Sequence, residues 1–306
     1  MSHVELDKFR RLDVVYKTLD GVPFEAVVIA PKSVLASQTA RPLLAHFHGG
    51  GLITGTALDR QMIPLWLLQF AESRGVIVAS PCFRLLPEAL GSEILDDIKD
   101  FWGFVFTTLN SIVAQTYGIS VDLGRVAAGG ESAGGMLALQ SAFLWPHTRI
   151  KLVMAQHCAF DLDSFAFNPK PLHVPEAASA WISEYLSNIK PGTFRVSSPF
   201  PEYRGLFQAA FNTGRYRDLL RGDRYMRIRE ALHEAKDVPP IWIAQGVNDR
   251  ITSQEAASEL VQEIRAAHPN TPFLYSLQPG GHGFDISHGM TEAWVQEGLR
   301  FAEQHW

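Results

Sequence analysis

The chain has 306 residues, of which 46% are hydrophobic and 19% are charged, as expected of a soluble globular protein with a large core. The formal net charge is −5 and the charged residues form no acidic or basic blocks, so nothing directs the chain to nucleic acid or to an anionic membrane. These features favour small-molecule chemistry. We expect a single domain over residues 1–306 that carries an insertion, because α/β folds commonly exceed the typical domain length.

Two cysteines, Cys82 and Cys158, are too few for a disulfide framework and lack metal-ligand spacing. We interpret both as buried apolar thiols in a reducing compartment, and we expect no metal and no organic cofactor. The first twelve residues are polar and charged, and no apolar run approaches the ~18 residues of a membrane span. The sequence therefore predicts neither secretion nor membrane insertion, and we expect a cytoplasmic location.

Strand and helix patterns alternate along most of the chain. Two short strands around 12–18 and 24–29, separated by Asp20 and Gly21, predict a hairpin at an antiparallel edge. The later strands are expected near 42–47, 75–80, 125–128, 150–155, 240–244 and 272–277, and the main helices near 60–73, 92–117 and 136–144. This alternation predicts an α/β fold with a mainly parallel sheet and helices on both faces.

About eighty residues between two of these strands have no strand character, although they contain many aromatic residues. A structureless loop of that length is improbable in a compact domain, so we predict a helical cap insertion at residues 161–225. Most of its aromatics are assigned to the cap's own core. Since ligand pockets are mainly apolar, we expect some aromatics to face the substrate, and we name Phe207 and Phe211 as candidates.

The sequence from Gly130 to Gly134 reads Gly-Glu-Ser-Ala-Gly between an apolar run and a helix-forming segment. A serine between such glycines occupies a sharp turn from strand to helix, with its hydroxyl clear of the sheet. The flanking glycines allow strand and helix to approach closely, because a Cβ at either place would press on the neighbouring backbone. The pattern indicates that Ser132 is a nucleophile, although a plain glycine-rich turn is the alternative for the motif alone.

A second glycine-rich stretch follows the strand at 42–47, where His48 precedes three consecutive glycines. Their backbone N–H groups are not screened by side chains, as a site for a developing oxyanion requires. We expect the N–H groups of Gly49, Gly50 and Ala133 to form this oxyanion hole. His48 is expected to brace the loop rather than to transfer protons.

Asp249 follows the strand that ends near residue 244, and His282 follows the strand that ends near residue 277. The carboxyl ends of parallel strands share one edge of the sheet, so both side chains are expected to converge on Ser132. The order serine, aspartate, histidine is that of a known hydrolase architecture. Asp161, Asp163 and Asp285 are rival acids, but none of them ends a strand as Asp249 does.

With these motifs, the chain resembles the hormone-sensitive-lipase group of α/β-hydrolase fold esterases, from about residue 12 to residue 304. The segment Phe83-Arg-Leu-Leu-Pro-Glu88 is similar to the group's Tyr-Arg-Leu-Ala-Pro-Glu, and we expect the two departures to be structural. The stretch before the first strand is short, so we expect the amino-terminal part of the cap seen in many members of the group to be reduced. The substrate cavity is then either more open or completed by a partner subunit, which leaves a homodimer as an option.

The resemblance implies a serine carboxylic ester hydrolase that acts on a small to medium apolar or aromatic ester through an acyl-enzyme on Ser132, with His282 as base and Asp249 as its orienting carboxylate. The expected partner is the small-molecule ester. Dehydratases and cyclases among plant and fungal relatives keep the same machinery, so elimination or cyclisation is a first alternative. A non-catalytic small-molecule binding protein is a second, and it is disfavoured because all these positions are intact.

Overall fold

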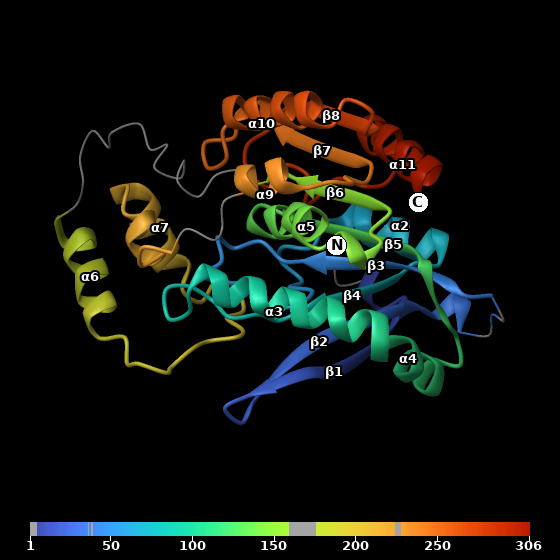
Figure 1. Ribbon diagram of the computed structural model, residues 1–306, viewed down its shortest axis with the longest axis horizontal. Coiled ribbons are helices and arrows are strands. Elements are labelled where there is room, and N and C mark those ends of the chain that lie inside the picture. The colour runs from blue at the N-terminus through green and yellow to red at the C-terminus, as the bar shows by residue number, and fades with distance from the viewer. Residues whose placement is uncertain (1–4, 36, 38, 159–175, 224–227) are drawn as a thin grey trace.

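The computed structural model describes residues 5–35, 37, 39–158, 176–223 and 228–306, which form helices on both sides of one sheet (Figure 1). The sheet has eight strands in the order β1-β2-β4-β3-β5-β6-β7-β8. The strands are β1 (Phe9–Leu19), β2 (Val22–Pro31), β3 (Arg41–Phe47), β4 (Ile77–Pro81), β5 (Val121–Glu131), β6 (Leu152–Gln156), β7 (Ile241–Gly246) and β8 (Phe273–Gln278). The first two pair antiparallel, β2 pairs antiparallel with β4, and all other neighbours are parallel. The predicted mainly parallel sheet with an antiparallel edge is therefore confirmed.

Alternating side chains of the central strands point to opposite faces of the sheet and pack into two hydrophobic cores. Leu43 packs into the core formed with helices α3, α5 and α10, whereas Leu44 packs into the core formed with helices α2 and α11. Both residues are fully buried, as expected of a strand covered on both faces. The helices are α2 (Leu65–Arg74), α3 (Gly91–Phe104), α4 (Asn110–Tyr117), α5 (Ala133–Leu144), α6 (Glu176–Ser187), α7 (Arg204–Thr213), α8 (Tyr216–Leu219), α9 (Ile228–Glu234), α10 (Gln254–Ala267) and α11 (Ala293–His305).

Two helix predictions can be compared with the structure. The helix expected over 92–117 is found as α3 and α4, joined by one π-helical turn at Val105–Leu109 and ended by Gly118 in the left-handed conformation. The start of the helix expected at 60–73 was wrong. Pro64 has extended backbone angles and precedes the first helical residue, so α2 begins only at Leu65.

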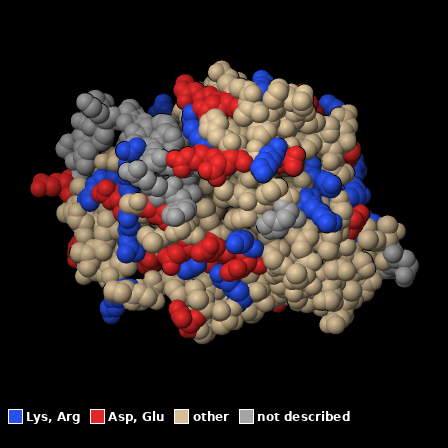
Figure 2. All heavy atoms as spheres, viewed as in Figure 1, with Lys and Arg blue, Asp and Glu red and all other residues tan. Residues whose placement is uncertain are grey.

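The described part of the predicted cap lies to one side of the sheet, at the left of Figure 1. Helices α6, α7 and α8 account for most of it, while residues 161–175 and 224–225 of the predicted insertion lie outside the described residues. The one described β contact in this region is an isolated bridge between Gly55 and Ser198. On the face shown in Figure 2, basic and acidic residues are interspersed, in line with the absence of charge blocks in the sequence.

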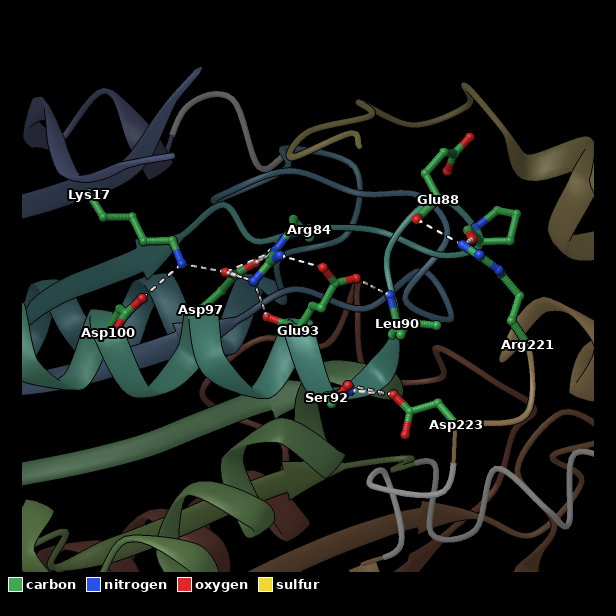
Figure 3. Close-up of polar contacts among 11 residues, drawn as sticks. Lys17, Arg84, Glu88, Leu90, Ser92, Glu93, Asp97, Asp100, Arg221 and Asp223 are labelled. Carbon is green, nitrogen blue, oxygen red and sulfur yellow. Dashed lines mark hydrogen bonds and ion pairs between the residues drawn. The ribbon is translucent and has the colours of Figure 1, made fainter. Parts of the chain in front are cut away.

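The segment 83–88 lies on α3 and is held there by charged side chains (Figure 3). The guanidinium of Arg84 is almost fully buried and contacts Asp97 at 2.8 Å and Glu93 at 2.9 Å. Lys17 reaches the same Asp97 from β1. Glu93 also accepts a hydrogen bond of 2.7 Å from the N–H of Leu90 and so caps the helix. These contacts fix the segment to which the cap is attached.

The cap is fastened to this segment largely through arginines that bind main-chain carbonyls. Arg195 donates to the carbonyl of Ile53 at 3.0 Å and to that of Leu86 at 2.6 Å, and it pairs with the carboxylate of Glu88 at 2.8 Å. Arg221 donates to the carbonyl of Glu88 at 3.2 Å (Figure 3). The cap is thus held over the glycine loop that follows β3.

Candidate active site

Ser132 lies in the sharp turn between β5 and α5. Its backbone angles, φ 55° and ψ −120°, are strained for a residue with a side chain. The turn is tight because a Cβ at Gly130 would lie 2.4 Å, and one at Gly134 1.9 Å, from the carbonyl oxygen of Phe47. The N–H of Ser132 donates to the carbonyl of Gln156 at 2.9 Å, which ties the turn to β6. The local sequence therefore holds the serine hydroxyl in one direction.

The structure brings Ser132, His282 and Asp249 together in one line of contacts. Nε2 of His282 lies 3.0 Å from the hydroxyl oxygen of Ser132, and Nδ1 of the same ring lies 2.9 Å from Oδ2 of Asp249. With Nδ1 as the protonated nitrogen, His282 donates to the carboxylate and accepts from the serine. The convergence predicted from the ends of three strands is thus present in the fold.

The carboxylate of Asp249 is held ionised by the loop after β7. It accepts hydrogen bonds from the N–H of Ile251 at 2.8 Å and from the N–H of Thr252 at 2.9 Å, and the side-chain amide of Gln245 donates at 3.1 Å. Burial alone would raise the pKa of Asp249, but the contact with His282 and these donors outweigh it and lower the pKa to about 2. The group is therefore an anion at neutral pH.

His282 is the candidate general base of this site, and its buried surroundings shift its pKa. Burial is the largest effect on its pKa and lowers it, the positive charge of His157 lowers it further, and Asp249 opposes both. The net result is a pKa below the ordinary value of 6.5. A neutral imidazole that accepts from Ser132 is the form required of a general base.

The glycine loop lies against the serine turn. A Cβ at Gly49 would be 3.0 Å from the carbonyl oxygen of Glu131 and 3.4 Å from Cβ of Ser132. Gly50 has φ 98°, and a Cβ there would lie 2.1 Å from the carbonyl oxygen of Thr54. Within the described ranges, the N–H groups of Gly49 and Gly50 donate no backbone hydrogen bond. These two N–H groups and that of Ala133 at the start of α5 are the donors predicted for the oxyanion hole.

His48 holds the glycine loop by contacts of its ring. Its ring stacks on Phe83 with centroids 4.4 Å apart, and Nδ1 lies 2.8 Å from the carbonyl oxygen of Gly49. Burial lowers the pKa of His48 to about 4, so the ring is neutral. Phe83 and Leu86, the two departures from the family-like segment, are fully buried. These positions fit the structural roles expected of them.

The two aromatic substrate-binding candidates lie on α7, next to the glycine loop. Phe207 packs against Gly51, where a Cβ would lie 2.5 Å from its ring. Phe211 stacks on Phe207 with centroids 6.1 Å apart. Phe207 thus borders the predicted oxyanion loop directly, whereas Phe211 reaches it through Phe207.

Of the three rival acids, only Asp285 can be compared with Asp249 in the structure. Asp161 and Asp163 lie outside the described residues. Asp285 is fully buried and is turned toward His157, 3.1 Å away. His157 itself was missed by the sequence reasoning, although it directly follows β6 at the same edge of the sheet as Asp249 and His282.

In the ranges given above, no group of three or more His, Cys, Asp or Glu side chains could hold a metal ion. Among the same residues, none of the helices has the length and apolar character needed to cross a bilayer.

Sequence comparisons connect the chain to known proteins. The family model described as the alpha/beta hydrolase fold matches residues 44–284. The chain is 29% identical over 311 residues to the "Probable carboxylesterase M8" of Phoma sp., and the match covers 97% of each chain. It is 29% identical over 204 residues to the "Probable carboxylesterase clz11" of Cochliobolus lunatus, a match that covers 61% of this chain and 92% of that protein.

Solved structures share the fold at low sequence identity. A Staphylococcus aureus protein of unknown function gives a TM-score of 0.68 at 19% identity, covering 97% of this chain and 99% of that one. The esterase LipW of Mycobacterium marinum gives a TM-score of 0.60 at 18% identity, covering 99% and 82%. These structural similarities agree with the eight-stranded sheet. Because the family model matches most of the length of this chain, the chain belongs to the alpha/beta hydrolase fold family.

Proposed function

We propose that the chain is a serine carboxylic ester hydrolase that forms an acyl-enzyme on Ser132. The observation that carries this proposal is the line of contacts from Ser132 through His282 to Asp249, at 3.0 and 2.9 Å. This order of contacts supports the roles of nucleophile for Ser132, base for His282 and orienting carboxylate for Asp249 in acyl transfer. The carboxylesterase names of the fungal relatives support the same reaction class.

In the first half of the proposed reaction, Nε2 of His282 takes the hydroxyl proton of Ser132 while the serine oxygen attacks the ester carbonyl carbon. The carbonyl oxygen becomes negative and is bound by the N–H groups of Gly49, Gly50 and Ala133. Loss of one such donor typically costs roughly 3 kcal/mol of transition-state stabilisation. His282 then gives its proton to the departing alcohol, and Asp249 stabilises the imidazolium in between.

In the second half, water replaces the alcohol. His282 removes a proton from the water as its oxygen attacks the acyl carbon, and the same N–H groups bind the second oxyanion. The proton returns to the oxygen of Ser132 as the acid is released. The free enzyme is regenerated, and the proposed reaction consumes one ester and one water.

The proposed substrate is a small to medium apolar or aromatic ester. Phe207 borders the glycine loop and is stacked on Phe211, so an aromatic wall stands beside the donors of the predicted oxyanion hole. Rigid walls favour ligands that fit over long chains that must be ordered on binding.

The test is labelling by an aryl phosphonate, followed by hydrolysis assays with aryl esters of increasing acyl length. We expect one phosphonate per chain on Ser132 in the wild-type protein, and none in Ser132→Ala. Absence of labelling in folded wild-type protein contradicts the proposal and favours a binding protein. Labelling without turnover of any ester favours elimination or cyclisation by the same residues.

A further inference from the structure

A second histidine–aspartate pair lies next to His282, beside the line of contacts from Ser132 through His282 to Asp249 that we call the triad. His157 follows β6, and Asp285 is on the loop that carries His282. Nε2 of His157 lies 3.1 Å from Oδ1 of Asp285, and both side chains are buried. The two atoms are at ion-pair distance but not aligned for a hydrogen bond, so charge dominates their attraction. The other oxygen of Asp285 accepts a hydrogen bond of 3.2 Å from Nε1 of Trp66.

The ring of His157 is in contact with the ring of His282. The centroids are 4.5 Å apart and the planes meet at 71°, an edge-to-face arrangement. The N–H of His157 donates to the carbonyl of Ala244 at 2.7 Å, and its carbonyl accepts from the hydroxyl of Thr252 at 3.0 Å. That hydroxyl also lies 2.8 Å from Oδ2 of Asp249. His157 is therefore fixed by residues that also hold the triad carboxylate.

The charges of Asp249 after β7 and Asp285 after β8 act on both rings, and the charge of Glu131 at the end of β5 acts on His157. Burial alone would lower the pKa of His157, but the charge of Asp285, followed by those of Glu131 and Asp249, raises it. The pKa of His282 is lowered, by burial and then by the charge of His157. The two pKa shifts have opposite directions, which favours a proton on His157 over a proton on His282.

We propose that His157 and Asp285 form a positioning pair for the triad histidine, an inference that rests on the hydrolase function proposed above. The ring of His157 supports the ring of His282, and its positive charge opposes protonation of His282 before a substrate binds. Asp285 keeps that charge in place, because an unpaired buried cation would give up its proton. The pair maintains His282 in the state that accepts the proton of Ser132.

The test is the pH dependence of the rate at which an aryl phosphonate labels Ser132, since labelling needs His282 as a base but needs no ester turnover. His157→Gln removes the positive charge and leaves the carboxylate of Asp285. His282 then takes a proton more readily, so the acid limb of the labelling rate is expected to move to higher pH by about half a unit or more. In His157→Gln/Asp285→Asn both charges are gone, and the limb is expected to return toward its wild-type position.

His46→Gln is the matched control. His46 is also buried, and its Nε2 lies 2.9 Å from the carboxylate of Glu131, yet it has no described ring contact with His282. The same substitution there is expected to lower thermal stability and to leave the acid limb in place. Two results would overturn the inference. One is an acid limb of the labelling rate that is the same in His157→Gln and in the wild type. The other is an acid limb that shifts as far in the double variant as in His157→Gln.

A measurement on unsubstituted protein covers the case in which a variant does not fold. In protein labelled with 15N-histidine, His157 is expected to be mainly imidazolium at pH 6.5 and His282 mainly neutral. The signal of His282 is recognised by its change when Ser132 is labelled. Failure of the wild type to label contradicts the hydrolase proposal, whereas normal labelling with a neutral His157 at pH 6.5 overturns only the positioning role.

Discussion

The phenolic oxygen of Tyr216 lies 2.6 Å from the carbonyl oxygen of Gly51, so α8 of the cap donates a hydrogen bond to the glycine loop beside Ser132. Tyr216 is almost fully buried, and burial raises the pKa of its hydroxyl, which therefore remains a donor. Phe207 packs against the same glycine. The cap thus helps to set the conformation of the loop that carries the predicted oxyanion donors.

Tyr216→Phe is expected to lower kcat for an aryl ester about five- to tenfold with little change in KM. The reason is that the lost hydrogen bond, worth about 1 kcal/mol, orders donors that act mainly in the transition state. Steady-state kinetics with a short aryl ester measures both constants. Tyr185→Phe is the control, because the hydroxyl of Tyr185 binds Glu88 instead of the loop. An equal loss of kcat in both variants would contradict the role given to Tyr216.

Ser132→Ala is expected to abolish ester hydrolysis while the protein stays folded, since the turn tolerates the loss of one oxygen. Triad serines contribute far more than a thousandfold to the rate. Circular dichroism and an aryl ester assay provide the two readouts. A variant that keeps more than about a thousandth of the wild-type rate would show that another group is the nucleophile.

Asp249→Asn is expected to lower kcat by about four orders of magnitude, because an amide favours the wrong imidazole tautomer of His282. Asp285→Asn, a matched change on the neighbouring loop, is expected to cost less than about tenfold, since Asp285 has no described hydrogen bond to His282 and its printed ion pair is with His157. Single-turnover and steady-state rates are compared for both. A larger loss in Asp285→Asn than in Asp249→Asn would reassign the acid of the triad.

The pH profile of kcat/KM is expected to fall on its acid side as His282 takes up a proton. The pKa of His282 lies below its ordinary value, so the midpoint of the fall should lie below about pH 6.5, and activity should be full above it. Asp249 has a pKa of about 2 and stays ionised through this range. Initial rates in a constant-ionic-strength buffer series give the profile. A midpoint above pH 7 would conflict with a neutral resting His282.

Phe207→Ala and Phe211→Ala are expected to change relative kcat/KM among aryl esters of different acyl size more than the rate on the smallest one. The two rings bound the space beside the glycine loop, so their loss alters which acyl groups fit. Phe194→Ala serves as the control, since Phe194 packs on Phe24 with centroids 5.8 Å apart. Equal shifts for every ester in all three variants would remove these phenylalanines from substrate selection.

Much of this arrangement could be predicted from local sequence. Strand ends followed by glycine-rich turns placed Ser132, Asp249 and His282 at one edge, because the edge follows from the direction of the strands. The role of His157 could not be predicted in this way. Its contact with Asp285 joins loops after β6 and β8, and no spacing in the sequence encodes that approach.

The hydrogen bond between Tyr216 and Gly51 could not be predicted from local sequence either, because the two residues are 165 positions apart in the chain. For helix α2, only the position of the first residue was predicted wrongly. The apolar residues near position 63 suggested an earlier start, but the backbone of Pro64 delays the first helical turn. Local patterns therefore predict which elements form, while the contacts between distant loops depend on how the complete sheet brings them together.

The attachment of the cap has an evolutionary consequence. Arg195 and Arg221 bind carbonyl groups of Ile53, Leu86 and Glu88, and a carbonyl is present whatever side chain the position carries. Substitutions in the underlying segment therefore leave these carbonyl contacts available, and only the pairing of Arg195 with the carboxylate of Glu88 depends on a side chain there. Cap sequences can diverge, or be exchanged between relatives, as long as the arginines are retained. New substrate preferences can then arise by changes within the cap, while the loops that carry Ser132, Asp249 and His282 and the arginine contacts that attach the cap stay the same.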